Sequence, residues 1–208
     1  TEEDTVSMKA IKAAGELILK GGKYSLDSAD DTIHSNANIT ISDGEFTLAS
    51  GDDGIHADSA TTISGGTIDI TESYEGIEGL SIDITGGETY VSGPTNDGNS
   101  ALDYNGTGTV TGGIFIAAGS SGMAENFGDS STQGVMMVTV NSQAAGSAVS
   151  LSDSSGNELV SWTPEKEYTS VIISCPEITT GQEYTLTTGS DTTQITMDSI
   201  VYGSGSGM

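Results

Sequence analysis

The stretches SADDTIHS (residues 28–35), SGDDGIHA (50–57) and ESYEGIEG (72–79) follow one another at a constant displacement of 22 residues. Each stretch places an acidic residue two positions before an isoleucine. Other aliphatic residues repeat with the same period, and the last members of two columns follow after a slip of one residue. The three columns are Ile11, Ile33, Ile55 and Ile77; Leu19, Ile41, Ile63 and Ile84; and Leu26, Leu48, Ile70 and Val91. A register of this constancy indicates a protein built from stacked units.

Each unit contains three short segments with alternating apolar residues, separated by turn residues such as Gly65-Gly66. Alternation predicts strands with one buried face, and glycine supplies the positive φ angles of tight turns. Three strands in ~22 residues form one turn of a coil whose turns stack about 4.8 Å apart. The sequence therefore predicts an all-β fold, a right-handed single-stranded parallel β-helix. An up-and-down barrel needs no constant register, and the leucine and asparagine spacing of a leucine-rich repeat is absent.

The repeat becomes irregular toward the middle of the chain. The segment SGPTNDGNSALDYNG (92–106) lengthens one turn, either as a functional loop at a corner or as a tolerated insertion. Residues 124–133 suggest a linker, and strand-like segments follow. We expect β-helix turns over residues 1–127 and a β-strand cap with a flexible tail, YGSGSGM, over 128–208. A cap is expected because an uncovered coil end exposes unpaired strand edges.

The composition limits the kinds of partner that the chain can bind. The net charge is −25, with 30 acidic residues against five lysines and no arginine. This excludes ordinary nucleic-acid binding, which needs a basic face. No stretch is apolar enough to predict membrane insertion, and Cys175, the single cysteine, has no partner for a disulfide within the chain. We expect a secreted or cell-surface protein; no signal peptide is seen, and the first residue is interpreted as the start of a processed chain or a cloned fragment.

The 22-residue register stacks acidic residues about 5 Å apart. The stacked columns are Asp31, Asp53 and Glu75; Asp30, Asp52 and Tyr74; and His34, His56 and Glu78. Two carboxylates at this distance repel by roughly 3 kcal/mol at an effective dielectric near 20, so a cation or raised pKa values are needed.

Ca²⁺ suits such a column because it accepts six to eight oxygen ligands in flexible geometry. The candidate Ca²⁺ ligands are Asp30, Asp31, Asp52, Asp53, Glu75, Glu78 and Asp97. The alternative is that aspartate pairs act only as turn formers, their side chains bonding to nearby backbone amides.

Two features refine this hypothesis. Lys9 lies one repeat before Asp31, and Lys12 one repeat before His34, so ammonium groups stand where later turns carry acids or histidines. His34 and His56 should point outward, as hydrogen-bonded surface residues or as ligand contacts. A pair of stacked histidines could bind Zn²⁺, but oxygen-rich surroundings without a thiolate favour Ca²⁺.

Catalysis is not expected. A polysaccharide lyase needs an arginine or lysine base. Arginine is absent, although Lys9 and Lys12, near the acidic columns, keep a lysine base open. The stretch SGDDGI (50–55) superficially resembles the paired aspartates of polygalacturonases, which as inverting enzymes hold two carboxylates ~6.5–9.5 Å apart. The companion NTD, GHG and RIK motifs of that family have no convincing counterparts. The aspartate pair also recurs in successive turns, which indicates a structural or binding role.

The chain resembles a family of secreted bacterial carbohydrate-binding domain-containing proteins. The resemblance rests on the continuous stretch from IKAAGELILKGG to ESYEGIEG (11–79) and on GPTNDGNSALDYNG, IAAGSSGMA, SDSSGNELVSWTPEKEYTSVIIS and GQEYTL. It implies a pectate-lyase-like β-helix that binds Ca²⁺ through paired acids and binds cellulose and polygalacturonate. Longer relatives carry further coils between the positions of Gly79 and Leu80, so this chain has fewer paired-acid turns.

The expected partner is therefore a polysaccharide. The candidate ligand-binding residues are His34, His56, Asp58, Tyr74, Tyr90 and Tyr104. Tyr90 should face outward, whereas Trp162 is better suited to the core of the cap. Few aromatic residues are present, so an acidic pectin-type glycan bridged by Ca²⁺ is favoured over crystalline cellulose. A structural alternative remains: a Ca²⁺-stiffened surface or filament protein that self-associates end to end.

Overall fold

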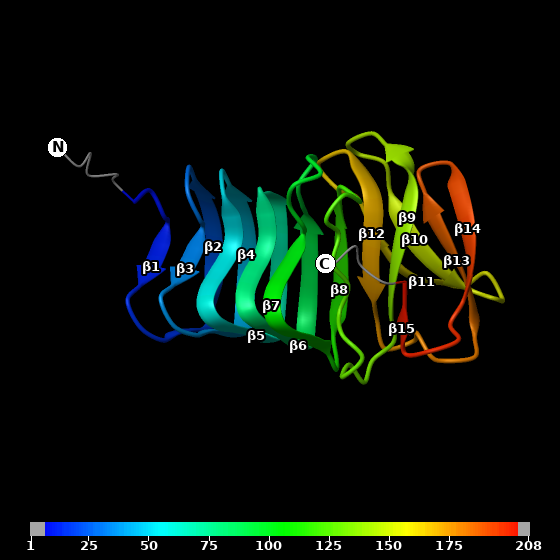
Figure 1. Cartoon of the computed structure of the whole chain (residues 1–208), viewed down its shortest axis with the longest axis horizontal. Helices are drawn as coiled ribbons and strands as arrows, with labels where there is room; N and C mark the ends of the chain where they lie inside the picture. Colours follow the sequence, from blue (N-terminus) through cyan, green and yellow to red (C-terminus); the bar gives the residue numbers. More distant parts are fainter. Residues whose placement is uncertain (1–6, 204–208) are drawn as a thin grey trace.

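The computed structural model describes residues 7–203, and these form a β-solenoid of about five turns with a β-rich cap. This confirms the predicted all-β parallel coil. Figure 1 shows the coils stacked along the long axis of the molecule, with β1 at the outer end and the cap at the other. The strands of the coils are β1 (Ile11–Ala13), β2 (Leu17–Ser28), β3 (Ile33–Ser35), β4 (Ile39–Ser50), β5 (Asp53–Glu72), β6 (Glu75–Ser92), β7 (Leu102–Val110) and β8 (Ile114–Gly119).

Parallel pairing follows the register read from the sequence. β1 pairs with β3 and β3 with β5, so that Ile11, Ile33 and Ile55 lie directly above one another. The next coil adds Ile77 through the pairing of β5 with β6. From Ile33 onward this column is fully buried, because it lines the interior of the coil.

The corners are less interrupted than the sequence suggested. The three segments of one coil run together as a single strand in β5, which bends through the corner at Gly65-Gly66. Gly66 has a φ of +85°, a conformation that disfavours side chains. Pairing between coils skips the glycine pair, stopping at Ser64 and resuming at Thr67, so the corner is a short irregularity within a strand that is otherwise continuous.

The segment 124–133 is not a linker, as the sequence had suggested, but continues to stack on the last coils. Gly128 N donates to Gly108 O at 2.8 Å, and Thr132 N donates to Val110 O at 3.1 Å. Phe127 is buried and packs edge-on against Phe115, with ring centroids 5.0 Å apart. These contacts extend the core of the solenoid toward the cap.

The cap is covalently and structurally continuous with the coils. Its strands are β9 (Val135–Gln143), β10 (Val149–Asp153), β11 (Glu158–Trp162), β12 (Tyr168–Ser174), β13 (Glu183–Thr188), β14 (Asp191–Thr196) and β15 (Val201–Tyr202). β12 pairs antiparallel with both β8 and β9, which carries the solenoid sheet into the cap. A separate antiparallel sheet has the order β11-β10-β13-β14.

The last described residues are held in place. Asn126 Nδ2 donates to Tyr202 O at 2.9 Å and to Gly203 O at 2.7 Å. The rest of the predicted flexible tail, residues 204–208, lies outside the described residues, and the domain boundary after residue 127 stays a prediction. No helix within residues 7–203 has the length and hydropathy to cross a membrane.

Candidate functional site

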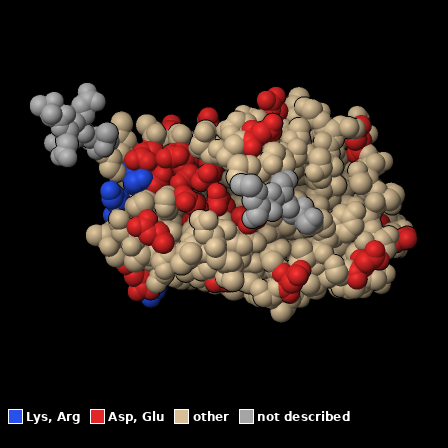
Figure 2. Space-filling view, in the orientation of Figure 1, with Lys and Arg blue, Asp and Glu red and all other residues tan. Residues whose placement is uncertain are grey.

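Acidic side chains gather at the corner where one coil ends and the next begins. Asp53 pairs in register with Glu75, and the neighbouring column runs from His34 through His56 to Glu78 and Asp103. Figure 2 shows this acidic cluster as a red patch on the coils, next to lysines at the β1 end. We call the side chains of this corner the acidic corner: Asp30, Asp31, Asp52, Asp53, Glu75, Glu78 and Asp103, with His34 and His56.

The second aspartate of each pair is buried, although aspartate is normally exposed. Asp31 is 0% exposed and Asp53 is 4% exposed. Asp53 Oδ1 has no hydrogen-bond partner in residues 7–203, whereas its Oδ2 lies 2.9 Å from His56 Nδ1. A buried carboxylate oxygen without a partner is unusual and calls for a cation or another donor.

Glycine brings the coils close together behind these acids. A Cβ placed on Gly54 would lie 2.7 Å from Gly76 O and 2.8 Å from Ile70 Cδ1. The glycine after the aspartate pair is therefore required by close packing between coils. The backbone at this position is tightly fixed, and it holds Asp53 at the corner.

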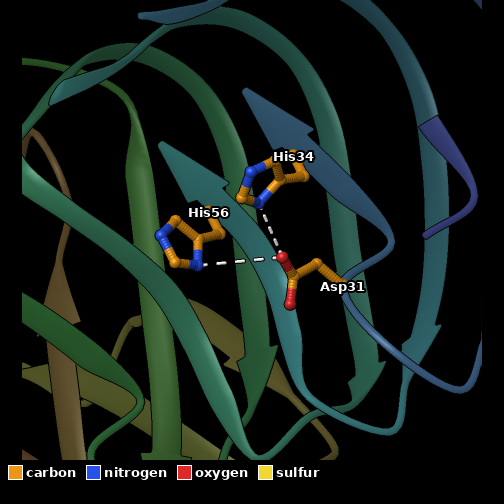
Figure 3. A group of neighbouring side chains, drawn as sticks. All are labelled: Asp31, His34 and His56. Carbon is orange, nitrogen blue, oxygen red and sulfur yellow. Dashed lines mark hydrogen bonds and ion pairs between the residues drawn. The ribbon is translucent and has the colours of Figure 1, made fainter. Parts of the chain in front are cut away.

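The two histidines are drawn into the acidic corner. Their rings leave the coil interior, as expected, but His34 is only 7% exposed and does not lie on an open surface. His34 Nδ1 lies 2.7 Å from Asp31 Oδ2, and His56 Nδ1 lies 3.7 Å from the same oxygen. Figure 3 shows both rings turned toward the Asp31 carboxylate. His56 Nδ1 also lies 2.9 Å from Glu78 Oε2.

Lys9 supplies a positive charge at the first coil. Its Nζ forms ion pairs with Asp31 Oδ2 and, at 2.9 Å, with Asp30 Oδ1. The registers also place Lys12 beside His34, as the spacing predicted. The ammonium of Lys9 thus compensates the outermost acids, while the coils that follow have no lysine in the same position.

The electrostatics of the acidic corner disfavour full ionisation. Burial raises the pKa of Asp53 to about 7, although the hydrogen bond with His56 acts in the opposite direction. Burial and the nearby carboxylates raise the pKa of Glu75 to about 7. The hydrogen bond with Asp53 raises the pKa of His56 to about 9. Burial is also the main cause that raises the pKa of Asp52 and of Asp103.

Two residues of this region escaped the sequence reading. Asp103 follows Glu78 in its column, and Asn99 Nδ2 donates to Glu75 Oε1 at 3.1 Å. Both lie on the lengthened turn, where the spacing departs from 22 residues and hides the alignment. The adjacent pair Leu102-Asp103 was the available signal, since it matches Ile77-Glu78.

Other candidates lie apart from the acidic corner. Asp97 accepts a hydrogen bond from Ser120 Oγ. Within residues 7–203, it belongs to no group of three or more metal-ligand atoms that lie within 4.8 Å of one another. Tyr90 points out of the coil, as expected, but it is half-buried because its ring stacks on Trp162 of the cap at a centroid distance of 5.9 Å. Tyr104 is half-buried and its hydroxyl donates to Asn126 O at 2.6 Å.

The remaining candidates stay near the acidic corner. Tyr74 is 50% exposed beside it, and its backbone N donates to Asp52 O at 2.7 Å. Asp58 Oδ1 lies 3.5 Å from His56 Nε2. A single exposed tyrosine next to a cluster of acids makes this a polar surface and not a flat aromatic platform.

Neither the curated proteins nor the solved structures contain a match to this chain. A family model described as carbohydrate-binding domain-containing protein matches residues 1–54, a segment that includes Lys9, both aspartate pairs and His34. The match agrees with the resemblance read from the motifs. Over these first coils, the chain is similar to the carbohydrate-binding domain-containing family.

Proposed function

We propose that this protein is a non-catalytic, extracellular carbohydrate-binding protein that holds Ca²⁺ in the acidic corner and binds an acidic cell-wall polysaccharide through it. The family match over residues 1–54 supports carbohydrate binding. The buried, incompletely partnered carboxylate of Asp53 is the observation that supports the cation.

The donor chemistry fits Ca²⁺. Carboxylate oxygens gather near Asp53, since Asp53 Oδ2 and Glu78 Oε2 both lie 2.9 Å from His56 Nδ1, and Ca²⁺ accepts six to eight oxygen ligands. The Lys9 ammonium already lies between Asp30 and Asp31, so the place that suits an added cation best is one coil further along. There the ligand atoms of Asp53, Glu78 and His56 lie within 4.8 Å of one another. Asp53 and Glu78 would hold the ion, with Glu75 and the solvent-exposed Asp52 beside them.

The charge of the chain favours an acidic glycan over cellulose. A net charge of −25 repels a polyuronate, and a Ca²⁺ ion at Asp52 would reverse that repulsion locally. Sugar carboxylates would complete the coordination of the ion. Crystalline cellulose would instead require an exposed aromatic platform, whereas the Tyr90 ring is packed against Trp162 of the cap.

The described residues do not favour a lyase. Hydrogen bonds and ion pairs with Asp31 and Asp30 raise the pKa of Lys9, although burial opposes them. A lysine held as ammonium is a poor general base. Lys9 therefore acts in charge compensation and not in proton abstraction.

Retention on immobilised polygalacturonate, with cellulose as the comparison, tests this function. We expect the wild-type protein to be retained on polygalacturonate in Ca²⁺ and released by chelator. The Asp52→Ala/Asp53→Ala variant should not be retained, whereas Glu45→Gln, which changes an exposed acid at another corner, should behave as wild type. Equal retention of the double variant and the wild type would contradict the proposal.

A second candidate function is a Ca²⁺-stiffened structural protein. The observation in its favour is the outer coil, where β1 pairs only with β3 and β2 only with β4 within the described residues. Open strand edges can pair with another chain. This candidate predicts Ca²⁺-dependent assembly in sedimentation velocity and no retention on either glycan. If assembly is observed and retention is not, the structural function replaces carbohydrate binding.

A further inference from the structure

The two histidines give the acidic corner a second chemistry that Ca²⁺ does not use. The ligand atoms of Asp31, His34 and His56 all lie within 4.8 Å of one another. His34 Nδ1 lies 2.7 Å from Asp31 Oδ2, and His56 Nδ1 lies 3.7 Å from the same oxygen (Figure 3). His56 Nδ1 also lies 2.9 Å from both Asp53 Oδ2 and Glu78 Oε2, so further carboxylates border the site. Imidazole nitrogen is a preferred ligand of late first-row divalent metals, whereas Ca²⁺ prefers oxygen.

We propose that Asp31, His34 and His56 form a binding site for a late first-row divalent metal of the Zn²⁺ class, selected over Ca²⁺ by the two imidazoles. Two histidines and one carboxylate are a ligand set that such metals use with further ligands from solvent. The site shares the acidic corner with the proposed Ca²⁺ site, but it does not depend on glycan binding.

The outer ring nitrogen of His56 provides independent support. His56 Nε2 lies 3.5 Å from Asp58 Oδ1, so a carboxylate stands on the side of the ring opposite Nδ1. Histidines that bind metals characteristically direct their second nitrogen to a carboxylate or carbonyl, which fixes the tautomer and orients the ring. Asp58 is thus placed as the residue that positions His56.

Burial and a nearby carboxylate complete the site. His34 and Asp31 have side chains that are 9% and 1% exposed, which fixes these two ligands, whereas His56 is 23% exposed and leaves one side of the site open to solvent ligands. Asp53 Oδ2 lies 2.9 Å from His56 Nδ1, and its Oδ1 is the buried oxygen without a partner in residues 7–203. Lys9 Nζ pairs with the same Asp31 oxygen, so the metal must displace it; Lys9 then keeps its ion pair with Asp30 Oδ1, at 2.9 Å. Imidazole nitrogens are what let a late first-row metal compete here, where Ca²⁺ would not.

Cobalt spectroscopy tests the site directly, because Ca²⁺ gives no visible absorption. Chelator-treated protein is titrated with Co²⁺ in an excess of Ca²⁺, and Zn²⁺ is then added. We expect visible absorption bands that saturate at one Co²⁺ per chain and disappear as Zn²⁺ displaces it. His34→Gln and His56→Gln should each lower Co²⁺ affinity at least about tenfold, and Asp58→Asn about tenfold through loss of ring orientation.

Asp52→Asn is the matched control, since it removes an acid of the same corner outside the histidine set. It should weaken Ca²⁺ binding and leave the Co²⁺ bands intact. His56 is more exposed than His34, so His56→Gln carries the test if His34→Gln fails to fold. Wild-type Co²⁺ affinity in His56→Gln, or no bands in the wild type, would overturn the metal site. In the latter case, retained Ca²⁺-dependent glycan binding would show that the proposed function stands without it.

Discussion

At the scale of single residues, the acidic corner is defined by carboxylates that burial makes hard to ionise. The pKa of Asp53 rises from 3.8 to about 7, and the pKa of His56 rises from 6.5 to about 9. In both cases the folded state binds protons more tightly than the unfolded chain. Stability therefore falls as pH rises through these ranges, because deprotonation favours the unfolded state.

The metal-free protein should accordingly lose stability as pH rises. For Asp53 the loss extends from about pH 4 to 7, and for His56 from about pH 6.5 to 9. Urea unfolding of chelator-treated protein across this pH range measures the loss. In Asp53→Asn, the free energy of unfolding should change less between about pH 4 and 7. A wild-type free energy of unfolding that rises between pH 5 and 7 would contradict these pKa directions.

Gly76 illustrates how a backbone position can limit the sequence. A Cβ on this residue would lie 2.2 Å from Ala101 O and 2.4 Å from Val91 Cγ1. We expect Gly76→Ala to destabilise the protein by about 1–3 kcal/mol through overpacking.

Gly15→Ala is the matched control for this change, since nothing lies within 4 Å of its Cβ position. Its unfolding midpoint in urea should stay close to that of the wild type. Equal midpoints for Gly76→Ala and Gly15→Ala would show that the coils can separate enough to admit a methyl group.

At the scale of elements, the cap is fastened to the solenoid by a lysine as well as by strand pairing. Lys166 Nζ donates to Ser73 O at 2.7 Å, and Glu165 N donates to Ser92 Oγ at 3.0 Å. Burial lowers the pKa of Lys166. The loop between β11 and β12 therefore reaches back across β8 to the coils that carry the acidic corner.

Lys166→Met should weaken this attachment. The substitution keeps the aliphatic length but leaves Ser73 O without its donor, at a cost of about 1–3 kcal/mol. Lys23→Met is the comparison, because its ion pair with Glu45 is exposed and should contribute less than about 1 kcal/mol. Thermal unfolding followed by Trp162 fluorescence measures both, and equal small effects would rule out an anchoring role for Lys166.

The stacking of the strands was predicted from the sequence except at the lengthened turn. The column Ile11, Ile33, Ile55 and Ile77 predicted the coil register correctly, since aliphatic spacing alone fixes which strand faces meet. The columns of acids followed from the same register. Asp103 was missed because the lengthened turn shifts it out of the repeat.

Local sequence patterns could not predict which residues are buried by segments distant in the sequence. The alternation correctly predicted that Tyr90 points out of the coil. It could not predict that the cap packs Trp162 against Tyr90. The linker predicted over 124–133 was wrong for a similar reason: its hydrogen bonds go to residues 108 and 110, about 20 positions away. The burial of His34 likewise depends on neighbouring coils.

At the scale of the whole molecule, charge is unevenly compensated. The net charge is −25, and the lysine that pairs with the acidic corner lies at its outermost coil. Like charges gathered on one face destabilise a compact fold. Bound divalent ions would stabilise the folded state by mass action, whereas monovalent salt only screens the repulsion.

Calcium calorimetry on chelator-treated protein, at ionic strength matched with NaCl, tests the central claim most directly. We predict saturable Ca²⁺ binding to the wild type and to Glu45→Gln, and a loss of at least about tenfold in affinity for Asp53→Asn, whose carboxylate supplies the buried, incompletely partnered oxygen. The absence of measurable binding to the wild type, or equal affinity in Asp53→Asn, would contradict the assignment of the acidic corner as a Ca²⁺ site.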